Sequence, residues 1–166
     1  MGEKSKYVEI ARESLQYYLK NHKYLEIEEK SNRRNGVFVS LKKNGILRGC
    51  IGTISPVMES IEEEIIRNAV EAGLHDPRFY PVMEEEMDDI DISVDVLSDS
   101  FPSSFEELEP MTKGIIVTSG SKRGLLLPNL EGISTPEEQL EIVLKKAGIK
   151  PFEDYSIEVF TVERFK

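Results

Sequence analysis

The dipeptide Asn44–Gly45 lies between two strand-like segments and restricts the possible folds strongly. Before it, Val37, Val39 and Leu41 alternate with other residues, as in a strand with one buried face. A two-residue type I′ turn needs positive φ at both positions, which Asn and Gly tolerate. Segment 46–53 is therefore predicted to return antiparallel to the first strand.

Two amphipathic helices are expected in the first half of the chain. Residues Lys6 to Lys20 place apolar side chains at helical spacing, and Ser5 is available as the N-cap. A second helix is expected from about Val57. The pair Asp76–Pro77 stops this helix, because proline disfavours helical geometry in the residue before it.

The last predicted helix has the best-defined ends. Thr135 as N-cap, Pro136 at the first helical position and Glu138 reaching back form a capping box. Gly148 supplies the stop after the last turn.

Four further strands are expected, at Ile90–Val96, Gly114–Thr118, Leu125–Leu127 and Ser156–Glu163. Ile90–Val96 alternates apolar and polar residues, which favours antiparallel pairing because parallel strands read as continuous apolar runs. Segment 101–110 is expected to be mostly loop, with room for one helical turn. The sequence thus predicts an α+β fold with a mainly antiparallel sheet and about three packed helices. One domain is expected over residues 1–166.

Composition narrows the class of protein. The 166 residues carry a formal net charge of −10, which disfavours nucleic acid and anionic membranes as partners. A single cysteine cannot form an intramolecular disulfide, and Met1–Lys6 lacks the apolar region of a signal peptide. A cytoplasmic location is therefore expected. Gly2 matches the myristoylation pattern only loosely, and the match is interpreted as chance.

The segment Leu47–Gly52 (LRGCIG) is the main candidate functional site. Gly49 and Gly52 bracket Cys50, which would let a substrate approach the thiol. The guanidinium of Arg48 would favour the nucleophilic thiolate. The alternative, favoured on spacing alone, is that Cys50 is a small residue packed within a strand.

The segment His75–Phe79 could add a base and charged groups to that site. His75 is a candidate catalytic base for Cys50, and Asp76 and Arg78 are candidate substrate-binding residues. The alternative is that Asp76 and Arg78 pair or cap the preceding helix, while His75 is exposed at the surface.

No metal or cofactor is expected, because one cysteine and two histidines at distant positions lack zinc-site spacing. The acidic runs Glu62–Glu64 and Glu84–Asp89 lack the ligand pattern of a calcium loop and are interpreted as solvated faces. Segment Gly120–Gly124 contains two cationic side chains, Lys122 and Arg123, but lacks the full phosphate-loop pattern. It is therefore predicted to be a hairpin turn.

Four segments, taken in their order along the chain, resemble the signature of the AMMECR domain family. They are Leu47–Gly52, Asp76–Phe79, Ile92–Ser98 and Gly124–Pro128. The similarity covers essentially the whole chain and is greatest to the A protein type of the prokaryotic AmmeMemoRadiSam system. One departure is the absence of tryptophan, with Tyr155 near a place where many members carry one.

The resemblance implies an α/β domain with a larger and a smaller subdomain, and a genomic association with Memo-type and radical-SAM proteins. It implies no particular reaction. Three functions remain open at this point. They are a cysteine-centred enzyme or modification factor acting on an unknown small-molecule substrate, a non-catalytic protein- or ligand-binding module, and a structural partner of a radical-SAM enzyme, which the family association alone suggests.

Overall fold

The chain, described by a computed structural model over residues 3–166, divides into two compact units. Unit 1 comprises the described residues up to Leu97 together with Glu163–Lys166, and unit 2 comprises Ser98–Val162. Gly2, the loose myristoylation match, lies outside the described residues. Two antiparallel sheets with packed helices confirm the α+β class. The single domain expected over the whole chain stays a prediction.

The sheet of unit 1 has the strand order β2–β1–β3–β8. Its strands are β1 (Val37–Lys43), β2 (Ile46–Gly52), β3 (Ile90–Leu97) and β8 (Val162–Phe165). Asn44 and Gly45 have φ of 53° and 79°, so the predicted turn between β1 and β2 is confirmed.

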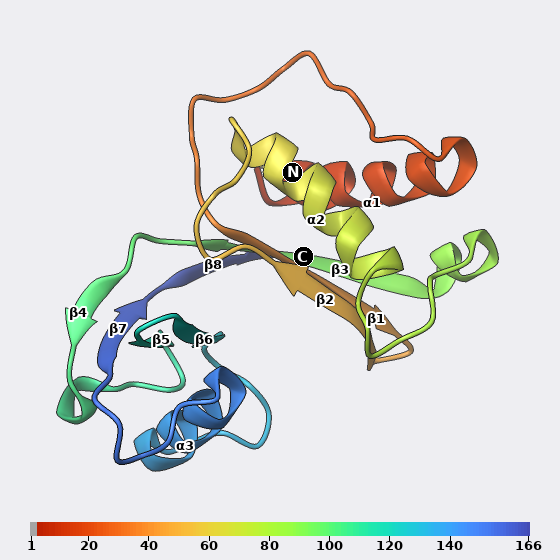
Figure 1. The fold of residues 1–166 in the computed structure, drawn as a ribbon. Coiled ribbons are helices and arrows are strands. Elements are labelled where there is room, and N and C mark those ends of the chain that lie inside the picture. Colours follow the sequence, from red (N-terminus) through yellow and green to blue (C-terminus); the bar gives the residue numbers. More distant parts are fainter. Residues whose placement is uncertain (1–2) are drawn as a thin grey trace. The chain divides into compact units, whose positions relative to one another are not determined.

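Two helices, α1 (Glu3–Asn21) and α2 (Ile61–Leu74), lie on one side of this sheet (Figure 1). Their apolar faces bury Leu15, Ile65 and Ala69 in one core with the alternating residues of β1. Two expected boundaries were wrong. Ser5 lies inside α1, and α2 begins at Ile61 because the Ser60 side chain accepts the backbone N–H of Glu63 as its N-cap.

The register of the β1–β2 pair decides where each residue of the LRGCIG segment points. Cys50 pairs with Ser40 and Gly49 pairs with Leu41, whereas Leu47 pairs with Lys42. Arg48 is therefore an extra residue at a bulge. Leu41 faces the helices, so the neighbouring pair Ser40–Cys50 lies on the opposite face of the sheet.

A loop and the 3₁₀ helix η1 (Glu84–Asp89) connect α2 to β3. The backbone N–H of Val82 donates to the Gly73 carbonyl at 2.8 Å, and the side chains of Val82 and Met87 are buried in the core. Most acidic side chains of η1 are exposed, as expected for a solvated face, but Glu86 is half-buried. The same prediction was wrong for Glu62 and Glu64 in α2, which are buried and accept hydrogen bonds from Ser31 and Thr53. Within residues 3–166 no helix is long and apolar enough to cross a membrane.

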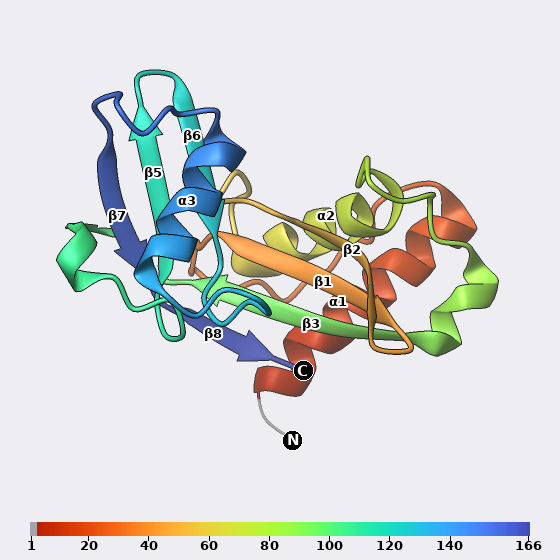
Figure 2. The same ribbon diagram turned by 90° about the horizontal axis from the view of Figure 1, so that it is seen from below.

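Unit 2 contains a second four-stranded sheet, in the order β4–β7–β5–β6. Its strands are β4 (Phe101–Ser103), β5 (Gly114–Ser119), β6 (Lys122–Leu126) and β7 (Ser156–Phe160), with the short 3₁₀ helix η2 (Phe105–Glu107). Helix α3 (Pro136–Ala147) lies against β5 and β6 (Figure 2). The β5–β6 hairpin and the capping box of α3 are confirmed, and Gly148 has φ of 74°.

Two predictions about strands failed in unit 2. The single closing strand expected at Ser156–Glu163 is two strands, because β7 pairs with β5 while β8 joins the other sheet after Thr161. Segment 101–110 was expected to be mostly loop with one helical turn; η2 provides that turn, but the first residues form β4, which pairs with β7. The first error arises because alternation shows a buried face but does not name the pairing partner. Strand β4 has no such alternation, since its three residues are exposed or half-buried.

Candidate functional site

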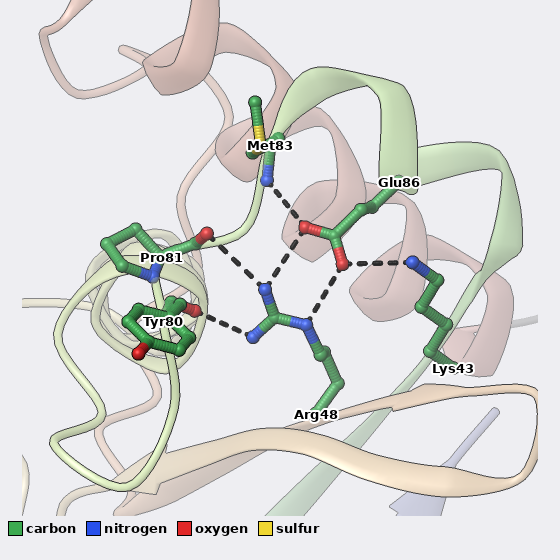
Figure 3. Close-up of polar contacts among 6 residues, drawn as sticks. All are labelled: Lys43, Arg48, Tyr80, Pro81, Met83 and Glu86. Atoms are coloured by element: carbon green, nitrogen blue, oxygen red, sulfur yellow. Dashed lines mark hydrogen bonds and ion pairs between the residues drawn. The ribbon is translucent and has the colours of Figure 1, made fainter.

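Arg48 uses its whole guanidinium to hold the loop that follows α2 (Figure 3). Its Nε and Nη2 atoms donate to the two carboxylate oxygens of Glu86 at 3.0 and 3.1 Å. Nη1 donates to the Tyr80 carbonyl at 2.7 Å, and Nη2 also donates to the Pro81 carbonyl at 3.3 Å. A planar guanidinium suits this forked arrangement, because its N–H groups lie in fixed directions.

Glu86 is the acidic centre of this network. Hydrogen bonds together lower the pKa of Glu86 to about 2; those from Arg48 have the largest effect, followed by those from the backbone N–H of Met83 and the Lys43 ammonium. The bulge at Arg48 thus ties the β1–β2 hairpin to the loop and to η1. Arg48 thus holds the loop through two backbone carbonyls and η1 through the Glu86 carboxylate.

Cys50 is partly buried in the middle of β2. The Ser40 hydroxyl donates to its sulfur at 3.2 Å. Its backbone N–H donates to Oδ2 of Asp76 at 3.0 Å, and its carbonyl accepts from Nη2 of Arg78 at 3.3 Å. Residues from the LRGCIG segment and from the loop after α2 therefore meet at Cys50.

The pair Asp76–Arg78 is built into this junction. The Asp76 side chain is 2% exposed and accepts from Arg78 at 2.8 Å. Hydrogen bonds together lower the pKa of Asp76 to about 2; those from the Arg78 side chain have the largest effect, followed by those from the backbone N–H groups of Cys50 and Arg78. The buried carboxylate is thus kept ionised and fully hydrogen-bonded.

Two guanidinium groups are electrostatically coupled to Cys50. The pKa of Arg78 is raised, first by its hydrogen bond to Asp76 and also by the charge of Cys50. The pKa of Arg164 in β8 is raised in the same way, first by Asp95 and also by Cys50. Arg164 binds both carboxylate oxygens of the buried Asp95, at 2.7 and 2.9 Å. Coulomb interactions are mutual, so both cations favour negative charge on the sulfur.

The two glycines of the segment permit close packing. A Cβ atom at Gly49 would overlap the Ala72 carbonyl oxygen of α2, and one at Gly52 would overlap the Phe38 ring. Gly49 therefore lets the helix backbone approach β2, while Gly52 leaves room for an aromatic ring on the Cys50 side of the sheet.

The structure brings together Cys50, Asp76 and Arg78, whereas His75 and Arg48 engage other partners. His75 is the C-cap of α2, its side chain is 51% exposed, and its Nδ1 lies 3.1 Å from Glu71. The alternative in which Asp76 and Arg78 pair and His75 is exposed therefore agrees with the geometry. Sequence reasoning missed Ser40, which lies across the β1–β2 hairpin from Cys50. It also missed Glu86 and Arg164, whose partners are 38 and 69 positions away.

The sequence matches a known family model over nearly its whole length. The family model AMMECR1 matches residues 8–166. This chain belongs to the AMMECR1 family.

Relatives of this AMMECR1 chain occur in bacteria and archaea. It is 46% identical to a Thermotoga maritima protein, covering 96% of this chain and 97% of the relative. It is 58% identical to a Clostridium acetobutylicum protein over 99% of its own length, but spans only 36% of that relative. The crystal structure of an uncharacterised protein from Pyrococcus horikoshii matches with a TM-score of 0.88 and 32% identity, covering 96% of this chain and 88% of the other.

Chemically, the AMMECR1 site offers a thiol, a hydroxyl and two cations, with their acidic partners on the same sheet and loop. Over residues 3–166 no cluster of three or more His, Cys, Asp or Glu side chains is arranged to hold a metal. The groups at Cys50 suit thiolate chemistry or recognition of an anionic group.

Proposed function

We propose that this AMMECR1 chain is a cysteine-centred enzyme or modification factor whose nucleophile is Cys50. The observation that carries the proposal is the environment of the sulfur, which combines the Ser40 hydroxyl at 3.2 Å with favourable interactions from Arg78 and Arg164. A hydroxyl donor and two cations stabilise a thiolate, which is the reactive form of cysteine.

The proposed chemistry does not require a histidine base. If the sulfur is already a thiolate, it attacks an electrophilic carbon, forms an S–C bond and expels the leaving group with its bonding electrons. The proton of the thiol has passed to solvent before the attack. Arg78, whose side chain is 56% exposed, would then contact a negatively charged part of the substrate.

Alkylation of Cys50 with iodoacetamide tests this proposal. Because the chain has one cysteine, each measured rate belongs to Cys50, and Cys50→Ser serves as the blank. The folded protein is expected to react at pH 7 about tenfold faster than the same chain in urea, and Arg78→Gln to slow the reaction several-fold. Arg123→Gln, in unit 2, makes the same charge change as a control. Folded and unfolded chains reacting equally fast would refute a reactive thiol.

A second candidate function is a protein-binding module. The specific observation is that the Arg48–Glu86 network fixes a loop with exposed apolar side chains. Tyr80 is 89% exposed and Met83 is 61% exposed, while Ile46 at the nearby hairpin is 73% exposed. The family resemblance suggests Memo-type and radical-SAM proteins of the AmmeMemoRadiSam system as partners, in the cytoplasm of a prokaryotic cell.

A pull-down with those two proteins separates the candidates. A binding module should lose its partner on Arg48→Ala or Tyr80→Ser and keep it on Cys50→Ser. An enzyme acting through Cys50 should lose activity on Cys50→Ser whatever happens to partner binding. Retention of the partner by both Arg48→Ala and Tyr80→Ser would refute the binding module.

A further inference from the structure

A groove of about 560 Å³ lies in unit 1, away from the LRGCIG segment in the sequence. It is formed by the segment after α1 and by the first half of α2. Its apolar lining consists of Leu25, Ile27, Met58, Ile66 and the ring of Tyr24. Its volume and largely apolar lining are typical of sites that bind small molecules.

One wall of the groove belongs to the long irregular segment 22–36 (Figure 1). Hydrogen bonds fix this segment against α2. Both the backbone N–H and the hydroxyl of Ser31 donate to the buried Glu62, at 2.9 and 3.0 Å, and the N–H of Ile61 donates to the Arg33 carbonyl at 2.9 Å. Irregular segments of this length in compact domains are commonly functional when they are ordered.

The charged residues of the groove are not equivalent. Glu63 is engaged by Lys30 at 3.5 Å and by the Ser60 hydroxyl at 2.9 Å, and Glu26 is exposed. Arg67 is half-buried, and within the described part of the chain no carboxylate lies within 4.0 Å of its guanidinium.

A buried amide fixes the position of Arg67. Nη1 of Arg67 donates to Oδ1 of Asn68 at 2.8 Å, while the Asn68 amide nitrogen donates to the Val37 carbonyl at 2.8 Å. Asn68 is fully buried, so the sheet anchors the residue that positions the cation. The other N–H groups of the guanidinium can still donate to an anionic group.

We propose that this groove binds a small amphiphilic anion. The aliphatic or aromatic body of the ligand packs against Leu25, Ile27 and Ile66, and its carboxylate, sulfonate or phosphate group accepts hydrogen bonds from Arg67. The site is independent of Cys50 and of the reaction proposed there.

Two fluorescent probes with the same ring system but different charge test the site. Anilinonaphthalene sulfonate is the anionic probe, and N-phenyl-1-naphthylamine is its uncharged counterpart. Both should bind saturably, with shifts of the Ile27 and Ile66 methyl resonances in NMR spectra. Arg67→Gln should weaken the anionic probe about tenfold and change the neutral probe less than about twofold, because only the sulfonate needs the cation.

Control variants separate the effect of the Arg67 guanidinium from general effects of charge or misfolding. Arg33→Gln removes an equal charge from an exposed residue of segment 22–36 that does not line the groove, and this variant should bind both probes as the original chain does. If Arg67→Gln does not fold, as judged by circular dichroism, Arg67→Lys keeps the charge but loses the fork and should weaken only the anionic probe. Added salt should weaken the anionic probe in the original chain.

Three results would overturn the proposal. They are binding that does not saturate, methyl shifts confined to residues outside the groove, and equal weakening of both probes by the Arg67 variant. Loss of alkylation at Cys50 would leave this site unaffected, so the two proposals fail separately.

Discussion

Asp76 fixes the main chain of Cys50, because one of its carboxylate oxygens accepts the Cys50 backbone N–H at 3.0 Å. The same oxygen accepts from Arg78 at 2.8 Å. The loop after α2 is therefore joined to the middle of β2 by a buried charge.

This relationship predicts a pH-dependent stability. The pKa of Asp76 falls from 3.8 to about 2 on folding, so its contribution is present above about pH 4 and is lost as the pH falls through about 2. Asp76→Asn should lower the free energy of unfolding by about 2 kcal/mol at pH 7. Urea titrations should show this difference shrinking between pH 4 and pH 2. A difference that stays constant over that range would contradict the assigned pKa.

The forked contacts of Arg48 predict that lysine cannot replace it. Arg48→Lys keeps the positive charge, but a lysine ammonium cannot contact Glu86 and both loop carbonyls together. The free energy of unfolding should therefore fall by about 1–3 kcal/mol. Hydrogen exchange should become faster at the Met83 amide, which donates to Glu86 at 2.8 Å. Lys43→Met, which removes only the partly exposed contact to Glu86, should cost less than about 1 kcal/mol. Equal effects of the two variants would argue against the fork.

Close packing at Gly49 predicts a steric effect. Gly49→Ala would push a methyl group into the Ala72 carbonyl and should lower the free energy of unfolding by about 3 kcal/mol. Gly120→Ala is the matched control, because it has φ of 59° and open space around it, and it should cost only about 1 kcal/mol. Urea unfolding followed by circular dichroism measures both. A Gly49 variant as stable as the Gly120 variant would show that α2 can move away.

The capping box of α3 predicts a modest local effect in unit 2. The Thr135 hydroxyl accepts the backbone N–H of Glu138 at 3.1 Å, and its loss in Thr135→Ala should cost about 1 kcal/mol. Thr112→Ala, at an exposed residue of the same unit, should be neutral within about 0.5 kcal/mol. Thermal unfolding followed at α3 would measure both variants, and a neutral Thr135→Ala would contradict the cap.

Local interactions explain which parts of the fold were predictable. The turn at Asn44–Gly45 and the cap at Thr135 depend on residues within a few positions, so their chemistry is visible in the sequence. The division of segment 156–163 between two sheets depends on strands that are far away in the chain, and alternation carries no information about them.

The candidate site was likewise predictable only where its signals are local in the sequence. The sequence singled out Arg48 and Cys50, but the partner of Arg48 is Glu86, 38 positions later and inside an acidic run that resembled a solvated face. No motif around Arg164 in the sequence marked it as part of the site. Its role depends on Asp95, 69 positions earlier, and on the register that sets β8 in the sheet of Cys50.

The return of the chain to unit 1 at Glu163 has a consequence for biosynthesis. Phe165 contacts the ring of Tyr7 at 5.0 Å between centroids, and Arg164 neutralises Asp95, so these late residues complete the unit that begins the chain. During translation, the inserted residues of unit 2 emerge before the sheet of unit 1 can close. A ribosome stalled before Arg164 would therefore hold a nascent chain in which Asp95 lacks its cation and the Tyr7 ring lacks its aromatic partner.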